Sequence, residues 1–244
     1  MKEKLAYLNE EIKGMPLADA IPYIIKNFEG KKVFSTSFGI EDQVLTHFIA
    51  PYAEFVNTFT LDTGRQFAET YEVFQRTQNK YPKLNIATYF PDAEDIKQYV
   101  SGNGINGFYN SIEQRKECCR IRKVVPLQKA ITGADLWITG LRAEQSDNRA
   151  DMQLLEWDDA NKLVKFNPLL HYTLKETEAL IDAYNIPLSS LYKKGYLSIG
   201  CAPCTRALAE GESFRAGRWW WEEQDKKECG LHVTTSAASH HTQH

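Results

Sequence analysis

Hydrophobic and polar positions alternate with a helical period at the start of the chain. Apolar residues recur every three to four positions at Leu5, Leu8 and Ile12, and again from Ile21 to Phe28. This spacing is typical of amphipathic helices that bury one face. We therefore predict two helices over residues 1–30, which precede the main domain, and Gly30 is expected to end the second.

Beyond residue 30, short β-rich runs alternate with helical patterns. Strands are predicted at 32–37, 54–60, 85–90, 135–139 and 162–166, with helices at 40–50, 66–81 and 173–184. Such alternation is typical of a mostly parallel sheet with helices on both faces. We predict an α/β, doubly wound sheet of about five strands over residues 31–232. A mobile C-terminal tail should follow, with residues 233–244 disordered.

Small and hydroxyl residues follow three of the predicted strands. These stretches are 35–39, 61–65 and 140–146. In parallel sheets, ligands bind beyond the carboxyl ends of the strands. The first stretch offers hydroxyls and backbone N–H groups at a helix N-terminus, which suits a phosphate. The Gly-Lys-Ser/Thr run of a Walker loop is missing from it.

Composition and charge narrow the class of protein. The net charge of −3 gives no reason to expect binding to nucleic acid or a membrane. No apolar run approaches the roughly 20 residues that span a bilayer, and the first residues lack the apolar core of a signal peptide. We expect a cytoplasmic protein, in which structural disulfides are rare. Its cysteines are therefore expected to be metal ligands or nucleophiles.

The five cysteines fall into two close pairs and a single residue. The pairs are Cys118 with Cys119 and Cys201 with Cys204, and Cys229 stands alone. Thiolates at this density suit zinc or an iron–sulfur cluster. Adjacent cysteines diverge on a helix, so they serve two irons of a cluster more easily than one tetrahedral ion. Zinc and buried, inert thiols remain the alternatives.

Cys229 and a group of arginines could carry further chemistry. The lysines at 226 and 227 favour the thiolate of Cys229, which could then attack an electrophile; an incidental surface thiol is the alternative. Arginine forks bind phosphate or sulfate oxygens in pairs. Arginines gather near the proposed ligand loops at Arg65, Arg142, Arg149, Arg206, Arg215 and Arg218.

Taken together, seven motifs between residues 33 and 232 resemble those of one family. They are Ser37–Asp42, Leu61–Arg65, Cys118–Lys123, Gly140–Ser146, Cys201–Cys204, Arg215–Trp221 and Glu228–His232. The set is similar to the assimilatory adenylyl-sulfate reductases, a branch of the phosphoadenylyl-sulfate reductase family. One departure is Ala143, where a second arginine is frequent. The resemblance implies an adenine nucleotide α-hydrolase-like fold. It also implies a [4Fe-4S] cluster on Cys118, Cys119, Cys201 and Cys204.

The resemblance implies a substrate and a mechanism as well. Phosphoadenylyl-sulfate reductases lack the cluster cysteines, so adenylyl sulfate is favoured, although a 3′-phosphorylated or dual substrate stays open. Cys229 would attack the sulfate sulfur and carry an S-sulfo intermediate. Thioredoxin or a glutaredoxin-like dithiol would then release sulfite. Lys123 would link cluster and substrate charge, and His232 would assist Cys229.

The remaining carried-over residues are expected to bind the substrate. Arg142, Arg215 and Arg218 would hold the phosphosulfate. The phosphate loop would be Ser35, Thr36, Ser37 and Gly39, and the adenosine side would be Leu61, Asp62, Thr63 and Gly64.

Two rival functions come from other classes. An adenylyltransferase of the ATP-pyrophosphatase type would need a Ser-Gly-Gly-x-Asp-Ser loop, which residues 35–39 do not supply. A zinc-bound interaction module would leave Cys229 and the arginines without a role. Whether the chain forms a homo-oligomer is left open by the sequence.

Overall fold

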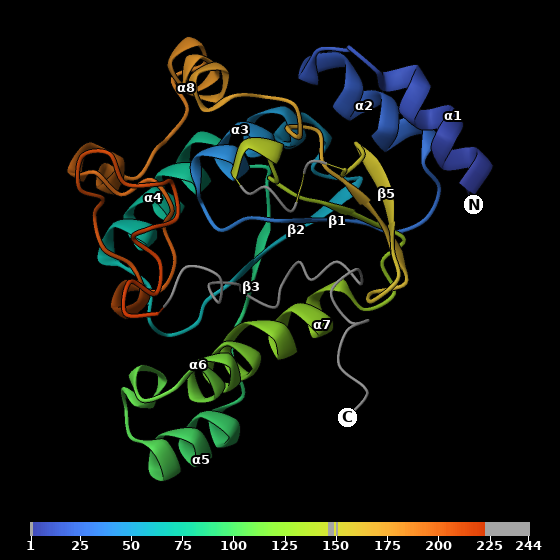
Figure 1. The fold of residues 1–244 in the computed structure, drawn as a ribbon. Coiled ribbons are helices and arrows are strands. Elements are labelled where there is room, and N and C mark those ends of the chain that lie inside the picture. The colour runs from blue at the N-terminus through green and yellow to red at the C-terminus, as the bar shows by residue number, and fades with distance from the viewer. Residues whose placement is uncertain (1, 146–148, 150, 223–244) are drawn as a thin grey trace, which may run out of the picture.

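A single six-stranded sheet organises the protein. A computed structural model describes residues 2–145, 149 and 151–222. The strand order is β3-β2-β1-β4-β6-β5, and every neighbouring pair is parallel except β5 with β6 (Figure 1). The strands are β1 (Lys32–Ser35), β2 (Val56–Leu61), β3 (Ile86–Tyr89), β4 (Leu136–Ile138), β5 (Leu155–Asp158) and β6 (Leu163–Phe166).

Helices cover both faces of this sheet. They are α1 (Lys2–Ile12), α2 (Leu17–Asn27), α3 (Ile40–Ile49), α4 (Ala68–Lys80), α5 (Ala93–Asn103), α6 (Ile112–Cys119), α7 (Val125–Ile131) and α8 (Leu174–Ala183). Successive residues of β1 point to opposite faces, as a strand requires. Phe34 packs in the core formed with α1, α2, α3 and α8, whereas Val33 packs with α7. The predicted doubly wound α/β fold is confirmed.

Most of the predicted elements are present, with one addition. Both N-terminal helices occur, and Thr173 caps α8 in a reciprocal capping box with Glu176. All five predicted strands occur. The sequence pattern missed β5, a four-residue edge strand that pairs antiparallel with β6. Its Asp158 is buried against Lys165 of β6 at 2.7 Å, and that partner cannot be seen in the local pattern.

One predicted boundary is wrong: Gly30 was expected to end the second helix, but α2 ends at Asn27, with Phe28 as its C-cap. In the glycine-rich stretch 102–107, α5 continues to Asn103 before Gly104 ends it with a φ of 80°. The predicted disordered segment, 233–244, lies outside the described residues. Within the described part of the chain, no helix is long and apolar enough to cross a membrane.

The last described segment returns to the middle of the chain. In Figure 1 the loops after α8 run beside α4 and come down to α6. Two short turns of 3₁₀ helix, Gly107–Tyr109 and Ala202–Cys204, lie in this region. Phe108 of the first packs against Cys204 of the second. Residues far apart in sequence therefore meet at the end of α6.

Candidate functional site

The loops after β1 and β4 meet at the carboxyl edge of the sheet. These strands are neighbours, and the chain continues from β1 to one side of the sheet and from β4 to the other. Ligands of α/β sheets bind at the point between two such strands. Gly140, directly after Thr139, lies so close to the first turn of α3 that an added Cβ would collide with the Asp42 carboxylate. The loop after β4 therefore contacts the helix that begins directly after the loop of β1.

The loop after β1 is held by its own polar groups. Thr36 is buried, and its hydroxyl accepts from the backbone N–H of Phe38 at 3.1 Å. Ser37 donates to Asp42 Oδ2 through its backbone N–H at 2.6 Å and its hydroxyl at 2.7 Å. Ser35 accepts from the Trp137 indole at 2.9 Å, and Gly39 precedes the first turn of α3. This places hydroxyls and a helix N-terminus in the predicted phosphate loop.

Asp42 is an unusual carboxylate. Burial raises its pKa from 3.8 to about 6, and the charge of Glu41 adds to the rise, while the bonds from Ser37 oppose it. A negative group thus already lies beside the N–H and hydroxyl of Ser37. An anion bound at this loop would meet Asp42 more favourably in its protonated form.

Arg142 is buried between two carboxylates. Its side chain is 1% exposed, and Nε donates to Glu41 at 2.8 Å while another nitrogen pairs with Glu144. Glu144 is 55% exposed, so it can exchange with solvent or with an anion more readily than Glu41, which is 10% exposed. The predicted contact of Arg142 with a phosphosulfate would therefore involve displacing Glu144.

All four cysteines of the two pairs line one cavity. Cys118 and Cys119 end α6, and a single stretch of π-helix, Arg120–Val124, follows them before α7. Cys201 and Cys204 flank the 3₁₀ turn that faces them. The cavity between the pairs is small, with a volume of about 20 Å³, and is partly open to solvent. The sequence-based pairing of these cysteines as one group agrees with this arrangement.

Positive side chains surround the same cavity. Its walls include Arg65, Arg115, Arg122 and Lys123. Burial raises the pKa of the Cys204 thiol to about 12, and the neighbouring Cys201 adds to this, whereas Lys123 and Arg218 oppose it. Burial also raises the pKa of Cys118, against the pull of Arg122. The cations offset part of the cost of holding thiolates together here.

The loop after β2 joins the nucleotide side of the fold to the cysteines. The Thr63 hydroxyl lies 3.3 Å from Cys201 Sγ, and its carbonyl accepts from Arg122 at 2.6 Å. The carbonyl of Arg65 accepts from the N–H of Ala202 at 2.8 Å. Gly64 takes a positive φ of 69°, and Asp62 accepts from its N–H. Of the four residues predicted on the adenosine side, from Leu61 to Gly64, Thr63 thus also touches the cysteine site.

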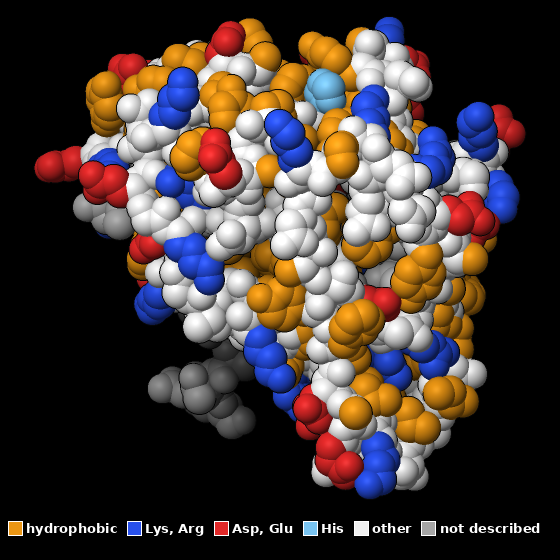
Figure 2. All heavy atoms as spheres, turned by 180° about the vertical axis from the view of Figure 1, so that it is seen from behind, with side chains coloured by type: hydrophobic (Ala, Val, Ile, Leu, Met, Phe, Trp, Pro, Cys, Tyr) orange, Lys and Arg blue, Asp and Glu red, His pale blue; other side chains and the backbone are white. Residues whose placement is uncertain are grey.

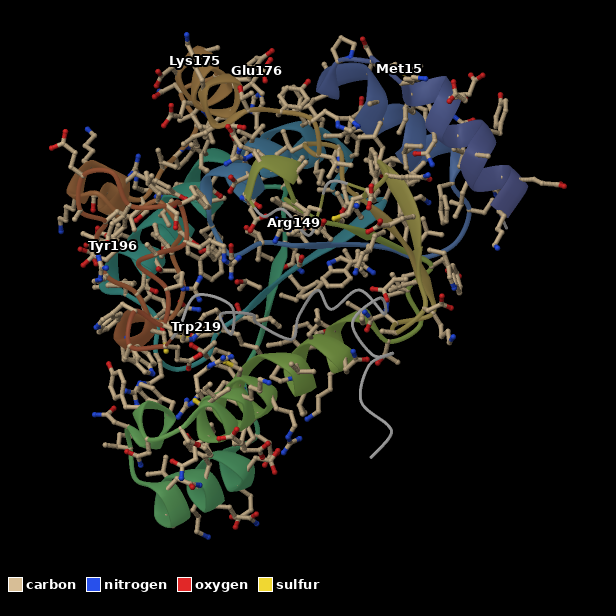
Figure 3. The ribbon with its side chains drawn as sticks, viewed as in Figure 1. Met15, Arg149, Lys175, Glu176, Tyr196 and Trp219 are labelled. Carbon is tan, nitrogen blue, oxygen red and sulfur yellow. The ribbon has the colours of Figure 1, made fainter. Side chains whose placement is uncertain are left out.

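The C-terminal loop adds a stack of aromatic and basic groups. Trp219, labelled in Figure 3, is 1% exposed. The guanidinium carbons of Arg115 and Arg218 lie 4.7 Å and 4.8 Å from the centre of its ring. The backbone N–H of Trp219 donates to the Cys204 carbonyl at 3.1 Å. Arg218 is buried and Arg215 half-buried near it. The predicted nucleophile Cys229 and its assistant His232 lie outside the described residues, so their positions stay predictions.

Several residues of this site escaped the sequence reasoning. Arg115 and Arg122 lie in the wall of the cavity, and Glu222 pairs with Arg115. The only local signal was the density of basic residues around the adjacent cysteines, from 115 to 123. Tyr109, which donates to the carbonyl of Pro203 at 2.6 Å, had no sequence signal at all.

The donor set fits an iron–sulfur cluster. Thiolates are the ligands of such clusters, and here four thiols face a shared space bordered by cations and aromatic rings. Among the described residues, no three His, Cys, Asp or Glu side chains are arranged to hold one metal ion. Each iron of a cluster needs one cysteine, so the ligands must surround a cavity rather than converge on a point.

Comparisons with known proteins point to one family. The model of the phosphoadenosine phosphosulfate reductase domain matches residues 31–207. The adenosine 5′-phosphosulfate reductase of Rhizobium meliloti is 46% identical over 231 residues, which is 95% of this chain and 86% of the relative. The enzyme of the same name from Allochromatium vinosum is 49% identical over 200 residues, covering 82% of this chain and 78% of the relative.

Solved structures support the fold. A phosphoadenylyl-sulfate reductase from Candida auris, in a phosphate complex, has a TM-score of 0.72 at 22% identity and covers 84% of this chain and 98% of its own. The FMN adenylyltransferase of Candida glabrata, solved with FAD and pyrophosphate, reaches a TM-score of 0.54 at 15% identity, covering 86% and 71%. At these identities the likeness concerns the arrangement of the chain alone.

Proposed function

The chain belongs to the phosphoadenosine phosphosulfate reductase family, and from this premise we propose that it reduces adenylyl sulfate to sulfite and AMP in assimilatory sulfate reduction. The relatives that cover most of the chain carry the name of that activity. The observation that carries the proposal is the meeting of four cysteines around one cationic cavity next to the strand-end loops. The alternative function, an adenylyltransferase, would leave the four cysteines without a role.

The four cysteines would hold a [4Fe-4S] cluster. Cys118 and Cys119 would bind from α6, and Cys201 and Cys204 from the facing turn. When bound, the cluster would supply the charge of its iron–sulfide core beside the sulfate end of the substrate. The thiol chemistry below needs no change in its oxidation state. Lys123 lines the same cavity and would balance charge between the core and the substrate.

The substrate would lie along the strand-end loops. The loop of residues 35–39 would face its phosphate, with the N–H and hydroxyl of Ser37 turning to it from Asp42, and the loop after β2 would face its adenosine. Arg215 and Arg218 would bind the sulfate oxygens, with Arg142 joining when Glu144 moves away. The loop after β2 reaches the cysteine cavity through Thr63 and Arg65, so the sulfur to be reduced would lie close to it.

The reaction would proceed in two thiol steps. The Cys229 thiolate would attack the sulfate sulfur, the S–O bond to the phosphate would break, and AMP would leave, with an S-sulfo group on Cys229. A thiol of thioredoxin or a glutaredoxin-like protein would then attack Cys229 Sγ and release sulfite, leaving a mixed disulfide. Its second thiol would resolve this, so the dithiol supplies both electrons and becomes a disulfide. We assign the reaction to the cytoplasm, where such dithiols are kept reduced.

The S-sulfo step gives a direct test. The protein should be incubated anaerobically without reductant, in one sample with adenylyl sulfate and in a parallel sample with 3′-phosphorylated adenylyl sulfate. The masses of its peptides should then be measured by mass spectrometry. We expect one added sulfonate on the peptide of Cys229, forming faster with adenylyl sulfate. Cys229→Ser should form none and release no sulfite while keeping its iron. A sulfonate on another cysteine, or full turnover by Cys229→Ser, would refute the nucleophile assignment. Faster labelling by the 3′-phosphorylated form would instead reverse the substrate preference.

A further inference from the structure

The backbone N–H groups of the loop after β1 already have acceptors within the protein. The N–H of Thr36 donates to the Phe59 carbonyl of β2 at 2.8 Å. The N–H of Ile40 donates to the Tyr192 hydroxyl at 2.8 Å, and the N–H of Phe38 donates to the Thr36 hydroxyl. Buried N–H groups are seldom left without a partner, so most donors of a folded loop are already in use. A phosphate that binds at this loop therefore has to compete with groups of the protein itself.

The two donors of Ser37 are held by one oxygen of a carboxylate. Its N–H and its hydroxyl both donate to Asp42 Oδ2, at 2.6 Å and 2.7 Å. A phosphate oxygen would take the same two donors, because it too is a negatively charged acceptor. On its other side, the Asp42 carboxylate lies against Gly140, where an added Cβ would collide with Oδ1. The carboxylate thus occupies the place of an anionic ligand.

No cation pairs with Asp42 in the described part of the chain. The nearby Arg142 pairs with Glu41 and Glu144 instead. The charged and titratable groups around Asp42 come from three elements, which are Glu41 of α3, Arg142 and Glu144 of the loop after β4, and Tyr192 of the turn Ser190–Lys194. Burial raises the pKa of the Tyr192 hydroxyl, so this group keeps its proton. Burial and the charge of Glu41 raise the pKa of Asp42 to about 6.

We propose that Asp42 is an internal competitor, which the phosphate of a nucleotide displaces from Ser37 with the uptake of one proton from solvent. Ionised Asp42 holds both donors of Ser37 and repels a phosphate. Protonated Asp42 releases these donors, and its own O–H can donate to a phosphate oxygen. The placement of the phosphate at this loop comes from the proposed function, on which this inference rests.

The competition would make Asp42 a specificity-determining residue. An inorganic sulfate or phosphate ion gains only the contacts of the loop, and these have to replace the bonds between Ser37 and Asp42. A nucleotide adds the contacts of its adenosine, so it can displace the carboxylate where a small anion cannot. Specificity of this kind comes from weakening the wrong ligand as well as from binding the right one.

The binding of adenosine 5′-methyl phosphate at different pH values tests the competition. This ester carries one negative charge from pH 5 to pH 9, so a change in its affinity comes from the protein. By calorimetry, the wild-type Kd should rise at least about tenfold from pH 6 to pH 8, because the fraction of molecules with a protonated Asp42 falls. Titrations at pH 7.5 in buffers of different ionisation enthalpy should show close to one proton taken up per ester bound.

Asp42→Asn should remove this pH dependence. The amide keeps an oxygen that can accept from Ser37 but carries no charge. The Kd for the ester should therefore be equal at pH 6 and pH 8, and lower than that of the wild type at pH 8. Inorganic sulfate should also compete with the ester at a lower concentration in this variant. Asp19→Asn is the matched control, because Asp19 is also the third residue of a helix but is exposed, and it should keep the wild-type pH dependence.

The wild-type measurement decides the matter even if Asp42→Asn does not fold. A wild-type Kd that is equal at pH 6 and pH 8, with no proton taken up, would overturn the competition. Proton uptake that persists in folded Asp42→Asn would assign the proton to another group and so refute the role of Asp42. A wild type that binds the ester with the expected pH dependence, yet never forms sulfite from adenylyl sulfate, would instead overturn the proposed reaction and leave the competition in place.

Discussion

At the scale of single residues, the protonation state of Asp42 affects both the stability of the fold and the predicted phosphate loop. Its folded-state pKa of about 6 exceeds the ordinary 3.8, so the folded protein holds this proton more tightly than the unfolded chain. The contribution of Asp42 protonation to the free energy of unfolding is complete below the pKa of the unfolded chain, and it is lost as the pH rises through about 6. Since Ser37 depends on this carboxylate, the same residue shapes the loop that would receive the substrate's phosphate.

Replacing Asp42 by asparagine should remove that titration. Asp42→Asn should be more stable than the wild type at pH 7, by up to about 3 kcal/mol, an upper bound because Asp42 keeps some contact with solvent. The difference in free energy of unfolding between the variant and the wild type should become smaller by about 1 kcal/mol on going to pH 5. Urea unfolding at the two pH values measures it. Asp182→Asn, on the exposed face of α8, is the control. A gap that widens toward pH 5 would contradict the raised pKa.

At the scale of elements, the break after α6 determines how the cysteine site is built. The π-helical stretch from Arg120 to Val124 changes the direction of the side chains that follow Cys119. Such stretches often occur at functional sites. Here Arg122 faces the loop after β2, where it donates to the Thr63 carbonyl, whereas Arg120 points to solvent and pairs with Glu117. One turn thus carries a buried and an exposed arginine.

These two arginines make a matched pair of variants. Arg122→Met should lower the free energy of unfolding by about 1.5–3 kcal/mol, because a charged hydrogen bond to a buried carbonyl is lost. Arg120→Met removes an exposed ion pair and should change it by less than about 1 kcal/mol. Chemical unfolding measures both. Equal effects would mean that the link from the helix to Thr63 does not stabilise the protein.

At the scale of the whole molecule, the cysteine site closes a long loop of chain. Cys119 and Cys201 lie on separate segments, and the strands β4, β5 and β6 and helix α8 lie between them in the sequence. A group bound to both segments would stabilise the folded state, since the unfolded chain cannot present the same four thiols together. The face shown in Figure 2 mixes basic, acidic and apolar side chains, so no single-sign field would dominate binding there.

Removing iron should therefore weaken the whole fold. If binding contributes about 4 kcal/mol, a chelator should lower the midpoint of thermal unfolding by about 10 °C. Scanning calorimetry under anaerobic conditions measures the shift. A variant with Cys118→Ser and Cys201→Ser should unfold at the midpoint of the chelator-treated wild type, and adding chelator should not change its midpoint. An identical midpoint with and without chelator in the wild type would show that no stabilising metal group is bound at these cysteines.

The sequence by itself determined the alternating strands and helices and the set of residues that could act as ligands or nucleophiles. Period and propensity act between near neighbours, so the N-terminal helices, five strands and the cap of α8 follow from local patterns. The two cysteine pairs could be matched with each other because thiols at such spacing have few other uses. The family motifs supplied the rest of the predicted site.

Only the tertiary structure decided which side chains face one another. Arg115 meets Glu222 and Thr63 meets Cys201 across more than 100 residues of chain, and Arg142 is enclosed by Glu41. The edge strand β5 owes its buried Asp158 to a lysine on the neighbouring strand. Partners such as these are selected by packing and by the cost of burying an unpaired charge. Both depend on the closed fold and leave no periodic trace in the sequence.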